Sequence, residues 1–209
     1  MSSTKQKILT AALKLFNKDG IVNVRLQHIA DEAFVSVGNL AYHYKNKEAI
    51  LLALYDELSK KQDHLLAEYR IVPLFDNIDR LIHHTFQLQQ TYIFFYLDTL
   101  EIMRAYPSIG ETHQKRIESQ IAQLKVIIDF NVSRGALMEE PLDGVFVQLA
   151  EQIWMTLDLW LTQQAISTSQ TANVQSYRSA VWSLFIPYFT DMGRLEYGQM
   201  LQMPYDFYF

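Results

Sequence analysis

Apolar residues recur at helical spacing along most of the chain. Ile8, Ala12, Leu15 and Phe16, for example, are three or four residues apart and would share one face of a helix. Glycine and proline, which interrupt helices, number only seven and five in 209 residues. Because no segment alternates apolar and polar residues as a strand does, the pattern predicts an all-α fold.

Breaks in this pattern separate the predicted helices. A first helix ends at Asp19-Gly20, since glycine commonly follows the last residue of a helix. Two short helices and six longer ones are expected after it. Their approximate ranges are, in order, 26–33, 37–44, 47–70, 74–90, 92–105, 109–133, 143–167 and 173–197.

The two short helices have the outline of a helix-turn-helix over about residues 26–45, in which the second helix enters the DNA major groove. The expected inward side chains of the pair are Leu26, Ile29, Ala30, Ala33, Val35 and Leu40. Ser36 is placed to cap the second helix, because its hydroxyl can accept a hydrogen bond from a backbone N–H that lacks a helical partner.

The first turn of the second helix carries the residues suited to reading bases. Asn39 can bond an adenine through two hydrogen bonds, and Val37 can touch a thymine methyl. Gly38 allows the backbone to approach DNA. Four residues that follow are placed to hold phosphates, which position a protein on DNA without specifying sequence. They are Tyr42, His43, Lys45 and Lys47.

Charge is unevenly distributed in a way that supports this interpretation. Residues 1–47 carry seven Lys/Arg and three Asp/Glu, a net charge of +4. The remaining eleven Lys/Arg and twenty Asp/Glu give residues 48–209 a net charge of −9. A basic DNA reader joined to an acidic body has this distribution. A compact three-helix unit that does not bind DNA is the alternative.

Other classes of protein find little support in the sequence. The chain has no cysteine, no secretory signal and no apolar run of roughly 18 residues, so a cytoplasmic protein without membrane spans is expected. No cofactor-binding motif or catalytic constellation appears, which argues against an enzyme. A metal site is not expected either, because the nearest candidate ligands match no ligand spacing. These are His83, His84 and His113 with Asp98 and Glu101.

Two stretches, Val35-Ser36-Val37-Gly38-Asn39-Leu40 and Tyr42-His43-Tyr44-Lys45-Asn46-Lys47, resemble the TetR family of bacterial transcriptional regulators. The resemblance covers about residues 4–55; beyond them it is one of size and helix count. It implies a DNA-binding domain over 1–50 and a C-terminal regulatory and dimerisation domain over 51–209. The expected DNA-binding residues are Arg25, Gln27, Ser36, Val37, Gly38, Asn39, Ala41, Tyr42, His43, Lys45 and Lys47.

Three positions depart from the family pattern. Arg25 stands where a threonine usually caps the preceding helix, and Ala41 where a tyrosine usually contacts DNA. Phe34 occupies the turn position where glycine is usual. A left-handed backbone there would cost on the order of 1 kcal/mol or more. Alternatively, the turn is reshaped and Phe34 packs against the core.

The last two predicted helices, 143–167 and 173–197, each carry apolar residues on two sides. One side suffices to face a core, so a second burial partner is implied. The two interpretations are a central place in the body and a homodimer interface. The tail 200–209 is aromatic and is expected to pack on the body or on a partner.

The segment 92–103 is unusually aromatic and suggests a pocket for an apolar or aromatic small molecule. The alternative is plain core. The candidate pocket residues are Phe86, Phe94, Phe95, Met103, Trp154 and Trp160.

The leading hypothesis is a ligand-responsive repressor that binds a palindromic DNA operator as a homodimer. The alternative is an all-α dimeric small-molecule-binding protein that has lost DNA binding. Phe34 and Ala41, which depart from the family pattern, favour this alternative.

Overall fold

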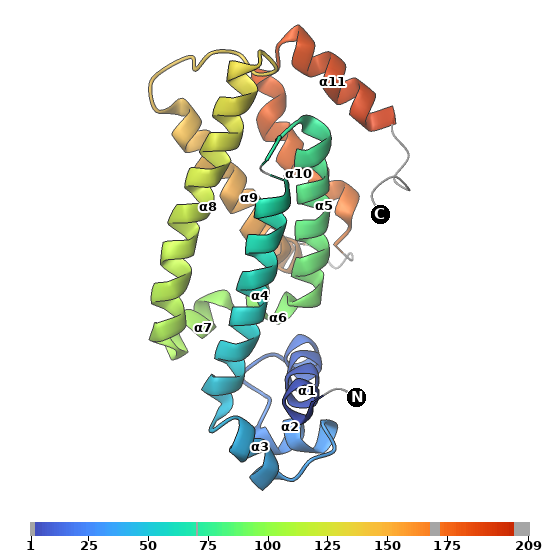
Figure 1. Ribbon diagram of the computed structural model, residues 1–209, viewed down its shortest axis with the longest axis vertical. Coiled ribbons are helices and arrows are strands. Elements are labelled where there is room, and N and C mark those ends of the chain that lie inside the picture. The colour runs from blue at the N-terminus through green and yellow to red at the C-terminus, as the bar shows by residue number, and fades with distance from the viewer. Residues whose placement is uncertain (1–2, 70, 168–171, 203–209) are drawn as a thin grey trace. The chain divides into compact units, whose positions relative to one another are not determined.

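The computed structural model describes residues 3–69, 71–167 and 172–202, and every regular element in these ranges is a helix (Figure 1). The one β-type pairing among them is an isolated bridge between Leu137 and Phe189. The chain forms two compact units. One holds the residues up to Gln62 together with Leu88–Thr112, and the other holds the rest. The predicted all-α fold is confirmed.

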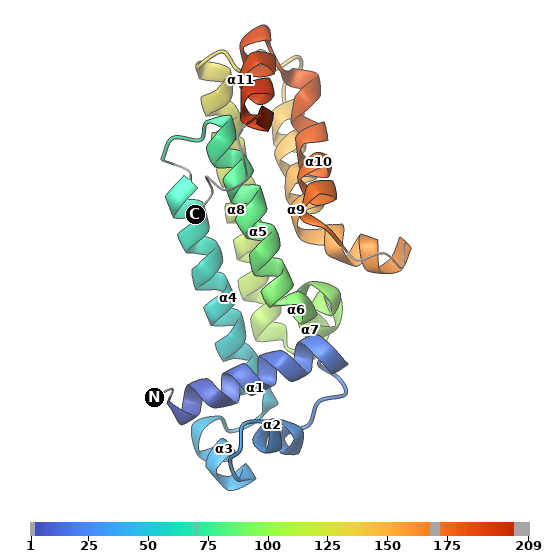
Figure 2. The same ribbon diagram turned by 90° about the vertical axis from the view of Figure 1, so that its right-hand side faces the viewer.

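The first unit contains α1 (Thr4–Asp19), α2 (Leu26–Glu32), α3 (Val37–His43) and the beginning of α4 (Lys47–Tyr69). α1 lies across α2 and α3 (Figure 2). Gly20 follows α1 with a φ of 75°, as expected of a residue that ends a helix. The fully buried side chains of these helices are Ile8, Ala12, Phe16, Ile29, Ala30, Leu40, Ile50 and Leu51.

Two short helices, α6 (Ile93–Leu97) and α7 (Thr99–Ala105), also belong to the first unit. The prediction of one helix over 92–105 is therefore wrong. Asp98 lies between them with φ −104° and ψ 13°, and its carboxylate accepts a hydrogen bond from the Ile21 N–H at 3.1 Å. Aspartate favours such breaks because its side chain competes for backbone groups.

The second unit contains most of α5 (Phe75–Thr91) and α8 (Pro107–Ser133), together with α9 (Val145–Ser167), α10 (Val174–Phe185) and α11 (Asp191–Gln202). α9 and α10 lie side by side in both views (Figures 1 and 2). Within the described ranges, no helix is both long and apolar enough to cross a membrane.

The prediction of one continuous helix over 173–197 is also wrong. A 3₁₀ turn, η1 (Ile186–Tyr188), separates α10 from α11. Pro187 in this turn has no N–H for helical hydrogen bonding, so it interrupts the helix. The hydroxyl of Thr190 then accepts a hydrogen bond from the Gly193 N–H at 3.2 Å and begins the next helix.

A buried ion pair joins α5 to α10 in the second unit. The Nε of Arg178 donates to Oδ1 of Asp79 at 2.8 Å, and a second guanidinium nitrogen donates to Oδ2. The indole N–H of Trp182 also donates to Oδ1, at 2.8 Å. All three side chains are buried. Removing one charge of such a pair leaves the other uncompensated in an apolar interior.

We expect Asp79→Ala to lower the free energy of unfolding by about 3–5 kcal/mol, because Arg178 loses its buried counter-charge. Urea denaturation followed by circular dichroism measures this loss. The matched control is Asp129→Ala, which removes the exposed partner of Lys125 and should cost at most about 1 kcal/mol. Equal losses in the two variants would contradict the assignment.

Candidate nucleic-acid interface

The turn between α2 and α3 is a tight helix ending that reverses the chain. The Val35 N–H donates to the Ala30 carbonyl at 3.0 Å, and the Phe34 N–H donates to the Asp31 carbonyl at 3.1 Å. These two bonds define a Schellman motif, which requires a left-handed residue and usually has glycine there. Phe34 adopts this conformation with a φ of 56°. The left-handed helix ending is thus formed without the glycine that it usually has.

The side chains between the two helices form the small core that the sequence predicts. Ile29, Ala30 and Ala33 of the first helix are buried, and Leu40 of the second is fully buried. Leu26 and Val35, also expected to face inward, are only partly covered. The alternative in which Phe34 packs against this core is wrong, because its side chain is 95% exposed.

The N-terminus of α3 is capped as the sequence predicts. The Ser36 hydroxyl accepts a hydrogen bond from the Asn39 N–H at 3.1 Å. Val37, Gly38 and Asn39 are exposed. A Cβ built on Gly38 would meet only the Ser36 hydroxyl, at 3.9 Å. The fold itself therefore does not require glycine here.

The side chains after Asn39 complete the exposed surface of α3 and of the loop that follows it. Ala41, Tyr42 and Lys45 are exposed, and the half-buried His43 ring meets the Tyr42 ring edge-on at 5.2 Å. Tyr42 is 84% exposed. The Tyr42 phenol can make a hydrogen bond to a partner, whereas the side chain of the neighbouring Ala41 on the same helix cannot.

Arg25 and Gln27 lie at the start of α2. The Arg25 side chain makes no capping hydrogen bond, as expected of a guanidinium, which has no acceptor. Instead, its backbone N–H donates to His28 Nδ1 at 3.3 Å. The Gln27 amide donates to Asp31 at 2.7 Å. Both residues are exposed, so the guanidinium of Arg25 and the amide of Gln27 lie at the surface at the start of α2.

Lys47 begins α4 and holds the loop between α1 and α2. Its ammonium donates to the carbonyl of Val24 at 2.8 Å and to the carbonyl of Ile21. It also lies 5.9 Å from the centre of the Phe16 ring. Burial lowers the pKa of Lys47, which the charge of Glu101 partly opposes. The phosphate contact expected of Lys47 stays a prediction, and its structural contacts are ones that the sequence did not reveal.

Two polar side chains join α1 and the loop after it to the segment from the end of α5 to the start of α7. The Asn17 amide donates to the Thr91 carbonyl at 2.9 Å and accepts from the Phe94 N–H at 3.2 Å. Asp98 binds the Ile21 N–H. No sequence signal marks these contacts, because the partners are 74–77 residues apart.

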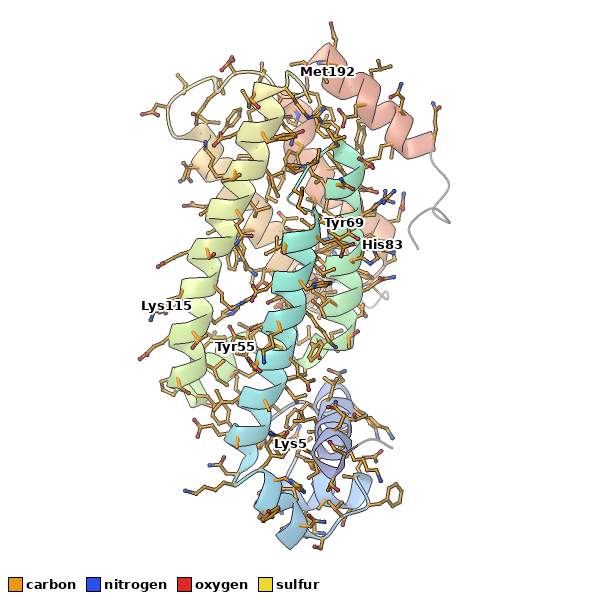
Figure 3. All side chains as sticks on the ribbon, in the orientation of Figure 1. Lys5, Tyr55, Tyr69, His83, Lys115 and Met192 are labelled. Atoms are coloured by element: carbon orange, nitrogen blue, oxygen red, sulfur yellow. The ribbon has the colours of Figure 1, made fainter. Side chains whose placement is uncertain are left out.

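The candidate pocket residues fall into two groups. Phe94, Phe95 and Met103 belong to the first unit, where the Phe94 ring packs 5.3 Å from Phe16. The Phe95 ring lies 5.2 Å from the ring of Tyr55, which Figure 3 labels on α4. Met103 packs beside Gly110, whose built Cβ would lie 3.6 Å from its sulfur.

The remaining three, Phe86, Trp154 and Trp160, belong to the second unit. The Phe86 and Trp160 rings lie 5.2 and 5.3 Å from the ring of Tyr177. The Trp154 indole donates to Gln120 at 3.1 Å. The Phe86, Trp160 and Tyr177 rings thus pack on one another. An effector site lined by the six candidate residues stays a prediction.

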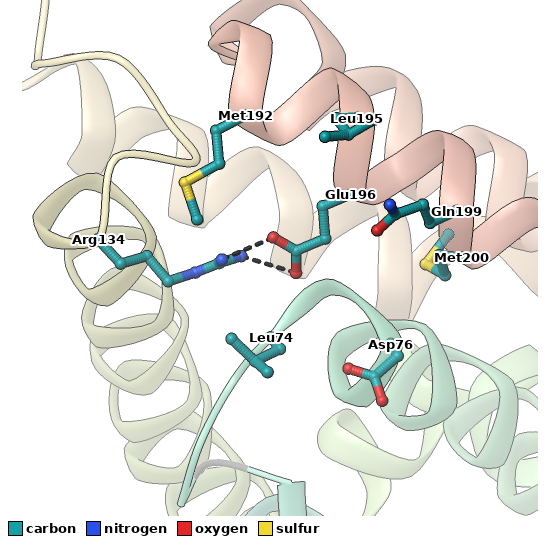
Figure 4. A pocket seen from close by; sticks show the side chains of 8 residues that line it. All are labelled: Leu74, Asp76, Arg134, Met192, Leu195, Glu196, Gln199 and Met200. Carbon is teal, nitrogen blue, oxygen red and sulfur yellow. Dashed lines mark hydrogen bonds and ion pairs between the residues drawn. The ribbon is translucent and has the colours of Figure 1, made fainter.

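A separate pocket of about 460 Å³ opens between the start of α5, the end of α8 and α11 (Figure 4). Its wall includes an ion pair between Arg134 and Glu196, whose two hydrogen bonds measure 2.6 and 2.9 Å. Of the aromatic tail, residues 203–209 lie outside the described residues. Among the described residues, no group of three or more His, Cys, Asp or Glu is arranged to hold a metal.

The capped α3 and the tight turn before it place this chain among helix-turn-helix proteins. Comparison with known proteins identifies the family. A model described as bacterial regulatory proteins, tetR family, matches residues 8–54. A second, described as a bacterial transcriptional repressor, matches residues 52–197. The chain therefore belongs to the TetR family.

Individual curated relatives match over less than a third of the chain. The regulator TtgR of Pseudomonas putida is 37% identical over 62 residues, which are 30% of this chain and 30% of TtgR. RutR of Escherichia coli is 40% identical over 58 residues, or 28% of this chain and 27% of RutR. The chain thus matches less than a third of either relative's length.

Solved structures are similar over nearly the whole chain. A TetR-family regulator from Marinobacter aquaeolei superposes with a TM-score of 0.82 at 22% identity, covering 96% of this chain and 98% of that one. SmeT, the repressor of a Stenotrophomonas maltophilia multidrug efflux pump, gives a TM-score of 0.67 at 17% identity, covering 91% and 92%. At these identities the similarity establishes the fold.

We expect Lys47→Met to lower the free energy of unfolding by about 1.5–3 kcal/mol, because it removes hydrogen bonds from a charged donor to the Ile21 and Val24 carbonyls. Lys45→Met is the matched control, since Lys45 is exposed and should stay within about 0.5 kcal/mol of the parent. Thermal or urea unfolding distinguishes them. An unchanged stability of Lys47→Met would show that its contacts do not hold the loop.

Proposed function

We propose that this protein is a transcriptional repressor that binds a palindromic DNA operator as a homodimer and releases it on binding a small molecule. The capped N-terminus of α3 carries the proposal, because it presents Val37, Gly38 and Asn39 to solvent. In helix-turn-helix proteins, N-terminal residues of this helix reach the base edges. The match to the family model over residues 8–54 supports the same role.

Asn39 is the base-reading residue in this proposal, since an amide can bond adenine through two hydrogen bonds. Val37 contacts a thymine methyl, and Gly38 allows the backbone to approach. The phosphate contacts come from Arg25, Tyr42 and Lys45. Tyr42 takes the contact that Ala41 cannot make, since its side chain is exposed on the same helix.

The homodimer is proposed to form through α9 and α10, as expected for 143–167 and 173–197. Four large apolar side chains are exposed along α9, although the helix also buries residues within its own unit. They are Val147, Met155, Leu159 and Ile166. A two-fold interface between copies would cover them. Two readers on one face of DNA would then contact half-sites about 10 bp apart.

The effector is proposed to be an apolar or aromatic small molecule bound in the C-terminal body. It acts by population shift, because it binds better to the conformation whose reader separation does not fit the DNA groove. The alternative, a small-molecule-binding protein that has lost DNA binding, gains no support from the turn. Phe34 leaves the hydrogen bonds between α2 and α3 in place.

We expect operator affinity to fall steeply as salt rises, because each phosphate contact releases counterions. The measurement is fluorescence anisotropy with a duplex that the protein selects from a random pool, over a series of potassium chloride concentrations. Lys45→Met should reduce the slope of log K against log salt by about 1. Affinity that is independent of salt, or failure to select any duplex, would contradict the proposed function.

A further inference from the structure

Phe34 combines two unfavourable properties in one residue. Of the described residues, it is the only one other than glycine with a positive φ, at 56°. Its side chain is also 95% exposed, the highest value among the large apolar residues that the structure exposes. Single exposed apolar residues are ordinary on protein surfaces. An exposed phenyl ring on a left-handed backbone is not, because glycine would avoid both costs.

Nothing in the described structure offsets these costs. The turn's hydrogen bonds use only the backbone of Phe34, so they fix its φ without using its ring. No ring contact or hydrogen bond joins its side chain to the described residues. Strained residues that persist without a structural reason occur most often at functional sites. The ring is therefore better explained by something that the protein binds.

The position of Phe34 indicates what that partner is. Phe34 is three residues before Val37, so their Cα atoms are separated by at most about 11 Å. The major groove that receives the N-terminus of α3 is about 12 Å wide. When Val37 and Asn39 reach base edges, the exposed Phe34 ring is therefore within a distance of the duplex comparable to the width of the groove. A phenyl ring carries no charge for a phosphate, but it packs favourably on a thymine methyl.

We propose that Phe34 is a DNA-contacting specificity residue whose ring packs on a thymine 5-methyl at the edge of the major groove. The proposal rests on the proposed function, since it assigns one further contact to the same interface. The contact removes an apolar ring from water only in the complex. Phe34 thus destabilises the unbound reader and stabilises the bound one.

Two variants separate the ring from the backbone strain. Phe34→Gly removes both, whereas Phe34→Ala removes the ring and keeps a Cβ on the left-handed backbone. We expect Phe34→Gly to melt about 2–4 °C above Phe34→Ala. Both should bind the selected duplex about 10-fold more weakly than the parent. Affinities that instead follow the melting temperatures would show a purely structural role and overturn the proposal.

The second measurement identifies the thymine. Each thymine of the selected duplex is replaced in turn by deoxyuridine, which lacks only the 5-methyl group. The parent protein should lose several-fold affinity at a thymine where Phe34→Gly loses none. Both proteins should lose equally at a thymine contacted by Val37. If the two proteins respond alike at every thymine, the proposed contact does not exist.

Two controls complete the design. Phe34→Tyr keeps the ring and should retain parental affinity and the same thymine dependence. Leu100→Ala removes another exposed apolar side chain, on α7, and should change neither affinity nor thymine dependence. If the parent selects no duplex, the proposed function fails and this inference fails with it. If the parent selects a duplex and both ring-deleted variants bind it as tightly as the parent does, only the role of Phe34 is overturned.

Discussion

The hydrogen bonds of the Lys47 ammonium are the interactions on which the helix-turn-helix depends. Without this ammonium, the carbonyls of Ile21 and Val24 would lose their charged donor, and the loop from α1 to α2 would lose its link to α4. Asp98 holds the same loop from its other side through the Ile21 N–H. The two charged groups therefore fix α2, and through the tight turn after it they fix α3. The positions of the exposed side chains in the first turn of α3 therefore depend on these two groups.

The locally determined parts of this site could be predicted from the sequence. Ser36 as a helix cap and the buried Ile29, Ala30 and Leu40 follow from residue type and spacing within a few positions. The Asn17 and Asp98 contacts could not be predicted, because they join segments far apart in sequence through single polar side chains. Their residue types are equally common in exposed loops.

The two wrong helix predictions have different causes. Pro187 in the sequence indicates a helix break. The apolar pattern that continues on both sides of it favours one long helix instead. The break at Asp98 had a weaker signal, since aspartate only disfavours a helix and its bond to Ile21 depends on tertiary structure. The split of the aromatic candidates into Phe94 with Phe95 and Phe86 with Trp160 also depends on how the chain folds into two units. Helical periodicity carries no information about that division.

The central claim is that the first turn of α3 reads DNA sequence, and Asn39→Ala tests it most directly. The affinities of the parent and the variant are compared on the selected duplex and on a scrambled duplex at the same salt concentration. We expect Asn39→Ala to lose about 10-fold or more in affinity for the selected duplex, as when a bidentate contact to a base is removed, with almost no change on the scrambled one. Equal losses on both duplexes would contradict the claim, because they would show that Asn39 does not read a base.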